Sequence, residues 1–176
     1  MYEKRTQKTY AILQVLVHKY QEITGNTLIG DEMKAHNLMY YIQKTALALT
    51  GEPIIAENFE GWVHGPVLPS MRGIFEDFDE DSEYEKQLSE TDIYIIENTI
   101  YSHGQYAAWA LREKSHQEQA WINSRKGLLA NERGQNELLL EDILEDAKDM
   151  RFYDYQYDMY LDEFDDIDEE NFIHVK

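Results

Sequence analysis

Apolar residues recur every three or four positions along the first fifty residues of the chain. They form one stripe from Tyr10 to Ile23 and a second from Ala35 to Leu49. This spacing predicts two amphipathic α-helices, because residues three and four apart share a helix face. Gly25 follows the first stripe and Gly51 the second, and glycine commonly ends helices. Asp31 stands where the second helix needs an N-cap.

The pattern changes after Gly51 and again near Ser89. Ile54 to Val63 predicts two short strands around Glu57-Asn58, a β-hairpin on an otherwise helical body. Ser89 with Asp92, and Ser115 with Glu118, have the spacing of capping boxes. In such a box each side chain satisfies a free backbone N–H at the start of a helix, so two further helix starts are predicted.

A third stripe dominates the C-terminal part of the chain, and it becomes aromatic towards its end. Its members are Leu140, Ile143, Ala147, Met150, Tyr153, Tyr157, Tyr160, Phe164 and Ile167. Carboxylates recur on another face. The spacing predicts one long acidic amphipathic helix from Asn136, either continuous or broken near Arg151. Like charges one turn apart oppose a helix, so its stripe needs burial on this body or on a partner.

These patterns together predict a mainly α fold. We expect a compact helical bundle with a small β-hairpin and a long acidic amphipathic C-terminal helix. Residues 1–134 are the expected helical domain, and residues 135–176 the acidic, aromatic-striped C-terminal extension. A chain of 176 residues is long enough to bury a sizeable core. Since it has no cysteine, no apolar leader and no membrane-length apolar run, we expect a cytoplasmic protein that does not contact membranes.

The net charge of −19 is unevenly distributed. Residues 76–90 carry eight acids and one lysine, and residues 137–176 carry fifteen acids against three cations. The remainder holds twelve charges of each sign. A neutral body with two acidic segments argues against direct nucleic-acid binding, which needs a concentrated basic surface. It favours a basic protein partner.

The sequence contains no recognisable set of catalytic, metal-binding or cofactor-binding residues. The six histidines (18, 36, 64, 103, 116 and 174) lack ligand spacing, and no phosphate loop or Gly-x-Ser-x-Gly sequence is present. Carboxylates in charge runs usually form a solvated face. Trp62, Trp109 and Trp121 are interpreted as core residues, with the alternative that one lines a binding groove. The sequence therefore predicts no enzyme and no cofactor.

Three motifs follow one another in a fixed order. The first is an apolar helix with Leu38, Tyr40 and Tyr41 that exits through Thr50-Gly51-Glu52-Pro53. The second is Trp62-Val63-His64-Gly65-Pro66-Val67, and the third is Ser115-His116-Gln117-Glu118-Gln119-Ala120-Trp121. In this order they resemble the Panacea antitoxin domain, the SocA-like family that also occurs in phage-associated proteins of the GepA type. The chain departs from the family pattern at His36-Asn37, where the family often has Gln-Lys, and at Ala120, where the family usually has proline.

The resemblance implies a mostly helical domain that neutralises a toxin by direct binding and has no enzymatic activity. Different members of the family are matched to unrelated toxins. The motif residues would then be scaffold: Tyr40, Tyr41, Gly51, Trp62, His64, Gly65, Pro66, His116, Glu118 and Trp121. The cognate toxin would meet parts that vary. A host protease is a further expected partner, because one member of the family delivers its toxin to a protease.

Residues 152–164 contain more aromatic side chains than a helix core requires, and tyrosine is well suited to protein interfaces. The candidate partner-binding residues are Phe152, Tyr153, Tyr157, Asp158, Tyr160, Asp162, Phe164 and Asp165. Two alternatives to an antitoxin stay open. One is a phage-encoded acidic DNA mimic that inhibits a host defence protein such as a nuclease, in the manner of anti-CRISPR or anti-restriction proteins. The other is a hydrolase that uses His64 or His116.

Overall fold

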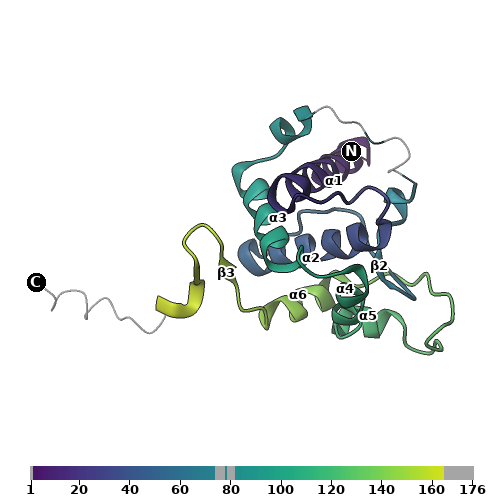
Figure 1. Cartoon of the computed structure of the whole chain (residues 1–176). Helices are drawn as coiled ribbons and strands as arrows, with labels where there is room; N and C mark the ends of the chain where they lie inside the picture. Colours follow the sequence, from purple (N-terminus) through teal and green to yellow (C-terminus); the bar gives the residue numbers. More distant parts are fainter. Residues whose placement is uncertain (1, 74–77, 79–81, 165–176) are drawn as a thin grey trace, which may run out of the picture.

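Helix α2 (Glu32–Thr50) runs through the middle of the molecule, with other helices on both sides of it (Figure 1). The computed structural model describes residues 2–73, 78 and 82–164. Helices α1 (Tyr2–Thr24) and α3 (Glu90–His103) pack together on one side of α2. Helices α4 (Ala108–Ser115), α5 (Gln119–Ser124) and α6 (Leu140–Lys148) lie on the other side. The mainly helical fold predicted from the sequence is confirmed.

Local signals set the ends of α2 as predicted. The carboxylate of Asp31 accepts a hydrogen bond from the backbone N–H of Lys34 at 3.2 Å. Gly51 adopts a left-handed conformation (φ 74°), and its N–H donates to the carbonyl of Leu47. Glycine reaches this conformation without the steric penalty that a Cβ brings.

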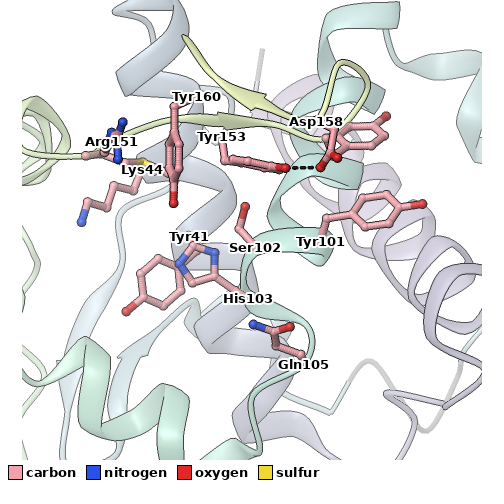
Figure 2. A pocket seen from close by; sticks show the side chains of 12 residues that line it. Tyr41, Lys44, Tyr101, Ser102, His103, Gln105, Arg151, Tyr153, Asp158 and Tyr160 are labelled. Carbon is pink, nitrogen blue, oxygen red and sulfur yellow. Dashed lines mark hydrogen bonds between the residues drawn. The ribbon is translucent and has the colours of Figure 1, made fainter. Parts of the chain in front are cut away.

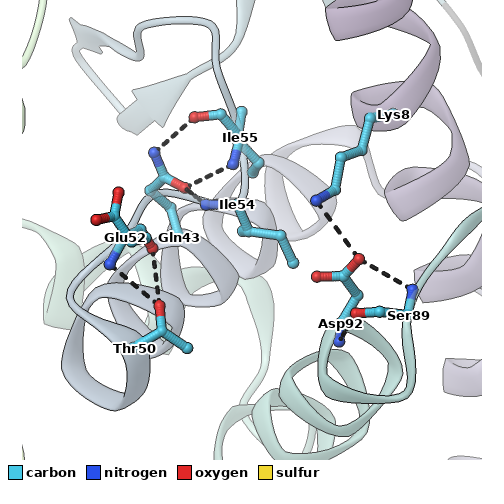
Figure 3. A network of polar contacts seen from close by, with 8 residues as sticks. All are labelled: Lys8, Gln43, Thr50, Glu52, Ile54, Ile55, Ser89 and Asp92. Carbon is cyan, nitrogen blue, oxygen red and sulfur yellow. Dashed lines mark hydrogen bonds and ion pairs between the residues drawn. The ribbon is translucent and has the colours of Figure 1, made fainter.

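The chain after α2 is held by one buried glutamine. The Gln43 side-chain oxygen accepts from the backbone N–H groups of Ile54 (3.1 Å) and Ile55 (2.9 Å), and its nitrogen donates to the Ile55 carbonyl (2.9 Å; Figure 3). The side chain thus replaces a strand partner, satisfying backbone groups in a segment without regular structure. Thr50 similarly accepts from the N–H of Glu52 (Figure 3).

One of the two predicted capping boxes is present. Ser89 and Asp92 exchange both hydrogen bonds at the start of α3, and Lys8 pairs with Asp92 at 3.4 Å (Figure 3). The prediction for Ser115 is wrong, because Ser115 ends α4 and its hydroxyl donates to the Arg112 carbonyl. Glu118, at the start of α5, directs its carboxylate towards α2 and caps nothing.

The predicted β-hairpin exists, but its predicted position is wrong. Strands β1 (Glu60–Trp62) and β2 (Gly65–Val67) pair antiparallel, and the chain turns at Val63-His64. The Ile54 and Ile55 backbone is occupied by Gln43, which explains why apolar residues of high strand propensity do not pair as strands there.

The prediction of one long C-terminal helix is corrected within the described residues. Helix α6 ends at Lys148, and residues 153–160 form a second hairpin from β3 (Tyr153–Asp154) and β4 (Met159–Tyr160). A 3-10 helix (Leu161–Phe164) follows, and residues 165–176 lie outside the described part. Repulsion between carboxylates one turn apart weakens a helix here, and aromatic residues favour strands. Within the described residues, 3-10 helices also span Pro69–Met71 and Ser82–Gln87.

The three tryptophans do not share one environment. Trp109 is 69% exposed on α4, so its interpretation as a core residue is wrong. Trp62 and Trp121 are half-buried and lie against the protein body. Aliphatic residues make up most of the core, and Tyr40 and Phe59, which are fully buried in it, meet edge to face at 5.7 Å. Among the helices that the structure describes, none combines the length and apolarity required to cross a membrane.

Gly65 provides a test of how tightly β2 packs against α2 and α4. A Cβ at this position would lie 2.8 Å from both Asn37 Oδ1 and Ser115 Oγ, and its φ of 121° disfavours other residues. We expect Gly65→Ala to lower the free energy of unfolding by about 3 kcal/mol, from strain and overpacking combined. Urea denaturation measures this loss.

The matched control is Gly51→Ala. Gly51 also has a positive φ, but a Cβ added there would meet no atom within 4 Å. This variant should lose only the conformational contribution, about 1–2 kcal/mol. Equal losses in the two variants would contradict the close packing at Gly65.

Candidate functional site: a tyrosine-lined cleft under the C-terminal hairpin

The C-terminal hairpin is fastened to α3 by a stack of three tyrosines. Tyr155, in the loop between β3 and β4, stacks on Tyr94 (centroids 5.6 Å apart) and on Tyr101 (4.5 Å). Its backbone N–H donates to Asn98 Oδ1 at 3.3 Å, and its hydroxyl donates to Glu97. Aromatic stacking adds to the apolar area that each ring buries. The loop between β3 and β4 therefore packs on α3 of its own chain.

The tip of the hairpin has a fixed shape. The carboxylate of Asp154, which is buried, accepts from the backbone N–H groups of Gln156 (2.9 Å) and Tyr157 (3.4 Å). Such a turn pre-forms the loop, because the side chain stands in for a backbone acceptor. Asp158 is left-handed (φ 55°), a conformation that aspartate tolerates better than most residues. Tyr157 is 73% exposed at this tip.

A cavity of about 680 Å³ lies between the hairpin, the middle of α2 and the C-terminal end of α3 (Figure 2). The hairpin side supplies Tyr153, Asp158 and Tyr160, three of the residues predicted from the sequence to bind a partner. Tyr155, in the hairpin loop, also lines the cavity. The body side and the approach to the hairpin supply Tyr41, Lys44, Tyr101, Ser102, His103, Gln105, Met150 and Arg151. We call this cavity the tyrosine cleft. Its rings present flat apolar faces with polar tips, which suits recognition of a protein surface.

Charges along the cleft are mostly paired. Lys44 donates to Glu118 at 2.9 Å. Arg151 covers the ring of Tyr160 at 3.7 Å and hydrogen-bonds Asp162. The Tyr153 hydroxyl donates to Asp158, and this bond raises the Tyr153 pKa to about 12. The cleft therefore presents neutral phenols beside carboxylates and cations that already have partners.

His103 forms the floor of the cleft as a neutral ring. It stacks on Tyr41 with centroids 4.1 Å apart and an interplanar angle of 18°. Burial, with smaller contributions from Lys114 and Lys44, lowers the pKa of His103 to about 4. Burial likewise raises the pKa of Tyr41. Both rings remain uncharged at neutral pH.

The other predicted partner-binding residues lie in different surroundings. Phe152 is 8% exposed and packs near Tyr94, so its side chain belongs to the body of the protein. Asp162 is half-exposed and paired with Arg151. Phe164 ends the last 3-10 helix, and Asp165 lies outside the described residues. The sequence did not single out Tyr101 or His103 for this site, because only the packing of α3 brings them to the cleft.

Two of the predicted scaffold residues, Tyr40 and Glu118, join α2 to the start of α5. The Glu118 carboxylate accepts from Lys44 and from the Tyr40 hydroxyl (3.3 Å), and burial raises the Glu118 pKa. Asp146 of α6 caps α5 by accepting from the N–H groups of Gln119 (3.2 Å) and Ala120 (2.8 Å). These carboxylates join three helices, which is a structural role.

The Trp62–Val67 motif is held by the third motif. Trp121 Nε1 donates to the Trp62 carbonyl at 2.9 Å, and His116 stacks on Trp121 at 3.9 Å. Pro66 lies opposite Gly61 in the hairpin. His64 is exposed and accepts from Arg112 Nε at 3.0 Å. Within the described residues neither His64 nor His116 hydrogen-bonds a carboxylate, and no cluster of three potential metal ligands occurs there.

Comparison with known proteins places these motifs in one family. The model of the family described as antitoxin SocA-like, Panacea domain, matches residues 33–122, about half of the chain. No curated protein and no solved structure gives a significant match. The matched region contains α2 to α5 except for the N-terminal residue of α2 and the last two of α5, together with the β1–β2 hairpin. The β3–β4 hairpin lies outside it, so the tyrosine cleft combines residues of the family region with residues beyond it.

The neutral state of His103 predicts a pH dependence of stability. A histidine whose pKa is lowered in the folded state contributes stability that is complete above its unfolded pKa near 6.5 and is lost as pH falls towards 4. Between pH 6.5 and 5 this residue should remove about 1.4 kcal/mol per pH unit from the free energy of unfolding. Denaturant titrations at several pH values measure the slope.

His103→Phe keeps a ring on Tyr41 but cannot bind a proton. Between pH 6.5 and 5, the free energy of unfolding of this variant should depend less steeply on pH. The slope should be smaller by about 1.4 kcal/mol per pH unit, which corresponds to the uptake of one proton. The residual slope reflects His36 and His116, whose pKa values burial also lowers. An unchanged slope would show that His103 is protonated as easily in the folded protein as in the unfolded chain.

Proposed function

The chain belongs to the SocA-like antitoxins with a Panacea domain, and on this basis we propose that it neutralises a cognate toxin by binding it directly, without catalysis. The toxin-binding surface in this proposal is the exposed side of the β3–β4 hairpin with the tyrosine cleft beneath it. A toxin partner is what the family implies in general. The choice of surface and the basic character of the partner are our inference.

One observation carries the proposal. Hairpin residues outside the family match, Tyr153, Asp158 and Tyr160, line the same cavity as family-region residues Tyr41 and Tyr101. A family whose members act on unrelated toxins needs a constant body and a variable contact element, and the hairpin has this relation to the body. Its fixed turn also supports the proposal, since a pre-formed loop loses little conformational entropy on binding.

Electrostatics supports a basic toxin. Residues 137–176 carry a net charge of −12, and such a field accelerates association with a basic surface. The tyrosines would supply most of the short-range binding energy, as aromatic anchors usually do. The DNA-mimic alternative would use the same acidic segment. However, Asp158 and Asp162 are engaged by Tyr153 and Arg151, so no observation favours a free array of phosphate-like charges.

Exposed aromatic residues of the hairpin should control the lifetime of the complex. The partner for this measurement is the protein encoded by the neighbouring gene, co-expressed and purified with the chain. We expect Tyr157→Ala, and separately Tyr160→Ala, to raise koff about tenfold or more, the effect of losing an aromatic anchor. The melting temperature should change little for Tyr157, which is 73% exposed. Trp109→Ala is the matched control, because Trp109 is 69% exposed but lies outside the cleft.

Trp109→Ala should leave both koff and toxin neutralisation in a growth assay unchanged. If this control variant loses binding while Tyr157→Ala retains it, the interface lies on α4 and the proposed surface is wrong. A partner that still binds a chain lacking residues 151–176 at full strength, with that chain folded, would refute the hairpin surface altogether.

Hairpin carboxylates should control the rate of association. We expect Asp158→Asn with Asp162→Asn to lower kon about threefold to tenfold and to flatten its dependence on salt, since long-range attraction acts before contact. The control replaces two exposed acids elsewhere, Glu83→Gln with Glu85→Gln, and changes the net charge equally. If a basic toxin approaches the hairpin, kon should fall more for the two hairpin substitutions than for the two control substitutions. Equal effects would show that only the total charge matters.

A further inference from the structure

A second cavity, of about 520 Å³, opens beside the first turns of α2. This part of α2 lies near β2 and away from the C-terminal hairpin (Figure 1). The first turns of α2, the β1–β2 hairpin and residues 133–134 form its walls. Apolar surface comes from Met33, Trp62, Val63, Pro66 and Val67. We call this cavity the arginine groove, because Arg72 and Arg133 stand at its rim.

The charge of the arginine groove is opposite to that of the chain as a whole. Arg72 covers the Trp62 ring at 5.1 Å and pairs with Glu32 at 3.2 Å. Arg133 is exposed and has no hydrogen bond or ion pair with any residue that the structure describes. His36 does not add charge, since burial lowers its pKa. The lining therefore carries two guanidinium groups against one carboxylate, on a chain of net charge −19.

Among the cations at or beside the groove, Arg133 alone has no partner within the described residues. Arg112, next to the groove, donates to His64 of the lining and pairs with Glu113 at 2.8 Å. An unpaired guanidinium beside an apolar wall is ready to bind a carboxylate through two parallel hydrogen bonds.

We propose that the arginine groove binds an acidic peptide segment of another protein, in which an apolar side chain is flanked by carboxylates. The apolar side chain would lie against Trp62 and Pro66, and Arg133 would bind a carboxylate. This binding surface is distinct from the tyrosine cleft and selects the opposite charge, so it goes beyond toxin neutralisation. The chain would then hold a basic protein at the tyrosine cleft and an acidic segment at the arginine groove.

Two other anionic occupants fit less well. A nucleic acid would bring many phosphates close to a chain of net charge −19, and the groove offers too few cations to offset that repulsion. A small inorganic anion would leave the apolar walls of Trp62, Val63 and Val67 exposed to water. A short peptide with few carboxylates uses both the cations and the apolar surface.

The test is a binding titration with the full chain and a defined probe. The probe is a fluorescein-labelled, end-blocked peptide Asp-Glu-Leu-Glu-Asp, and its control is the uncharged Asn-Gln-Leu-Gln-Asn. Fluorescence polarisation at low salt should show saturable binding of the acidic peptide. The uncharged peptide should bind at least tenfold more weakly. Indistinguishable affinities of the two peptides, or no saturable binding, would overturn the proposal.

Variants locate the site. Arg133→Gln should weaken the acidic probe at least fivefold with an unchanged melting temperature, because Arg133 has no hydrogen bond or ion pair to lose among the described residues. Lys126→Gln removes an exposed cation outside the groove and should leave affinity unchanged. Tyr157→Ala, in the C-terminal hairpin, should also leave it unchanged, which separates this proposal from the toxin-binding surface. Equal weakening by Lys126→Gln and Arg133→Gln would show non-specific attraction and refute the groove.

Competition identifies the class of occupant. Unlabelled acidic peptide should displace the probe, whereas inorganic phosphate or a short single-stranded oligonucleotide should require at least a hundredfold higher concentration. Displacement by phosphate or by the oligonucleotide at concentrations similar to the peptide would show a general anion site, and the peptide proposal would fail.

Discussion

Burial of polar side chains on α2 is the constraint on which the rest of the structure depends. The helix is covered on both sides, and a buried polar group needs a partner to offset its lost hydration. Lys34 donates to the Tyr20 hydroxyl of α1 (2.7 Å) and to the Gly104 carbonyl after α3 (2.9 Å). His36 accepts from the N–H of Leu68 at 3.2 Å, and Gln43 holds the segment after the helix. Each of these side chains therefore fixes the place of one surrounding element.

The same pairing of buried and partly buried charges shapes the two proposed binding surfaces. Lys44, the residue after Gln43 on α2, is neutralised by Glu118, which leaves the tyrosine cleft without a free cation on that wall. At the beginning of the helix, Arg72 is only partly neutralised by Glu32, and Arg133 has no partner in the described part of the chain. Ion pairs within the body thus determine which charged side chains remain available to an external molecule. The net negative charge of the whole chain does not determine this.

Features encoded within a few residues could be predicted from the sequence, and features encoded by packing could not. Asp31, Gly51 and Ser89 mark helix ends because caps act locally. The helical prediction for the tail is wrong because Tyr153, Tyr157 and Tyr160 fit a helical period, whereas Tyr153, Tyr155 and Tyr157 also alternate as in a strand. The serine–glutamate spacing at Ser115 forms no box, since that serine bonds back into the helix it ends. Three residues of the cleft were anticipated, yet Tyr101 and His103 reach it only through the packing of α3.

The position of α1 limits whether the family region, residues 33–122, can be excised or exchanged between relatives by itself. Ile12, Leu13 and Leu16 of α1 are fully buried, and the helix packs along α3. Residues 33–122 that match the family therefore do not contain the whole hydrophobic core. Excising that stretch would expose an apolar face on α3 and remove the phenol that holds Lys34. The evolutionary unit recognised by sequence and the cooperative unit that folds have different boundaries, and recombination between relatives would have to exchange the N-terminal helix together with the motif region.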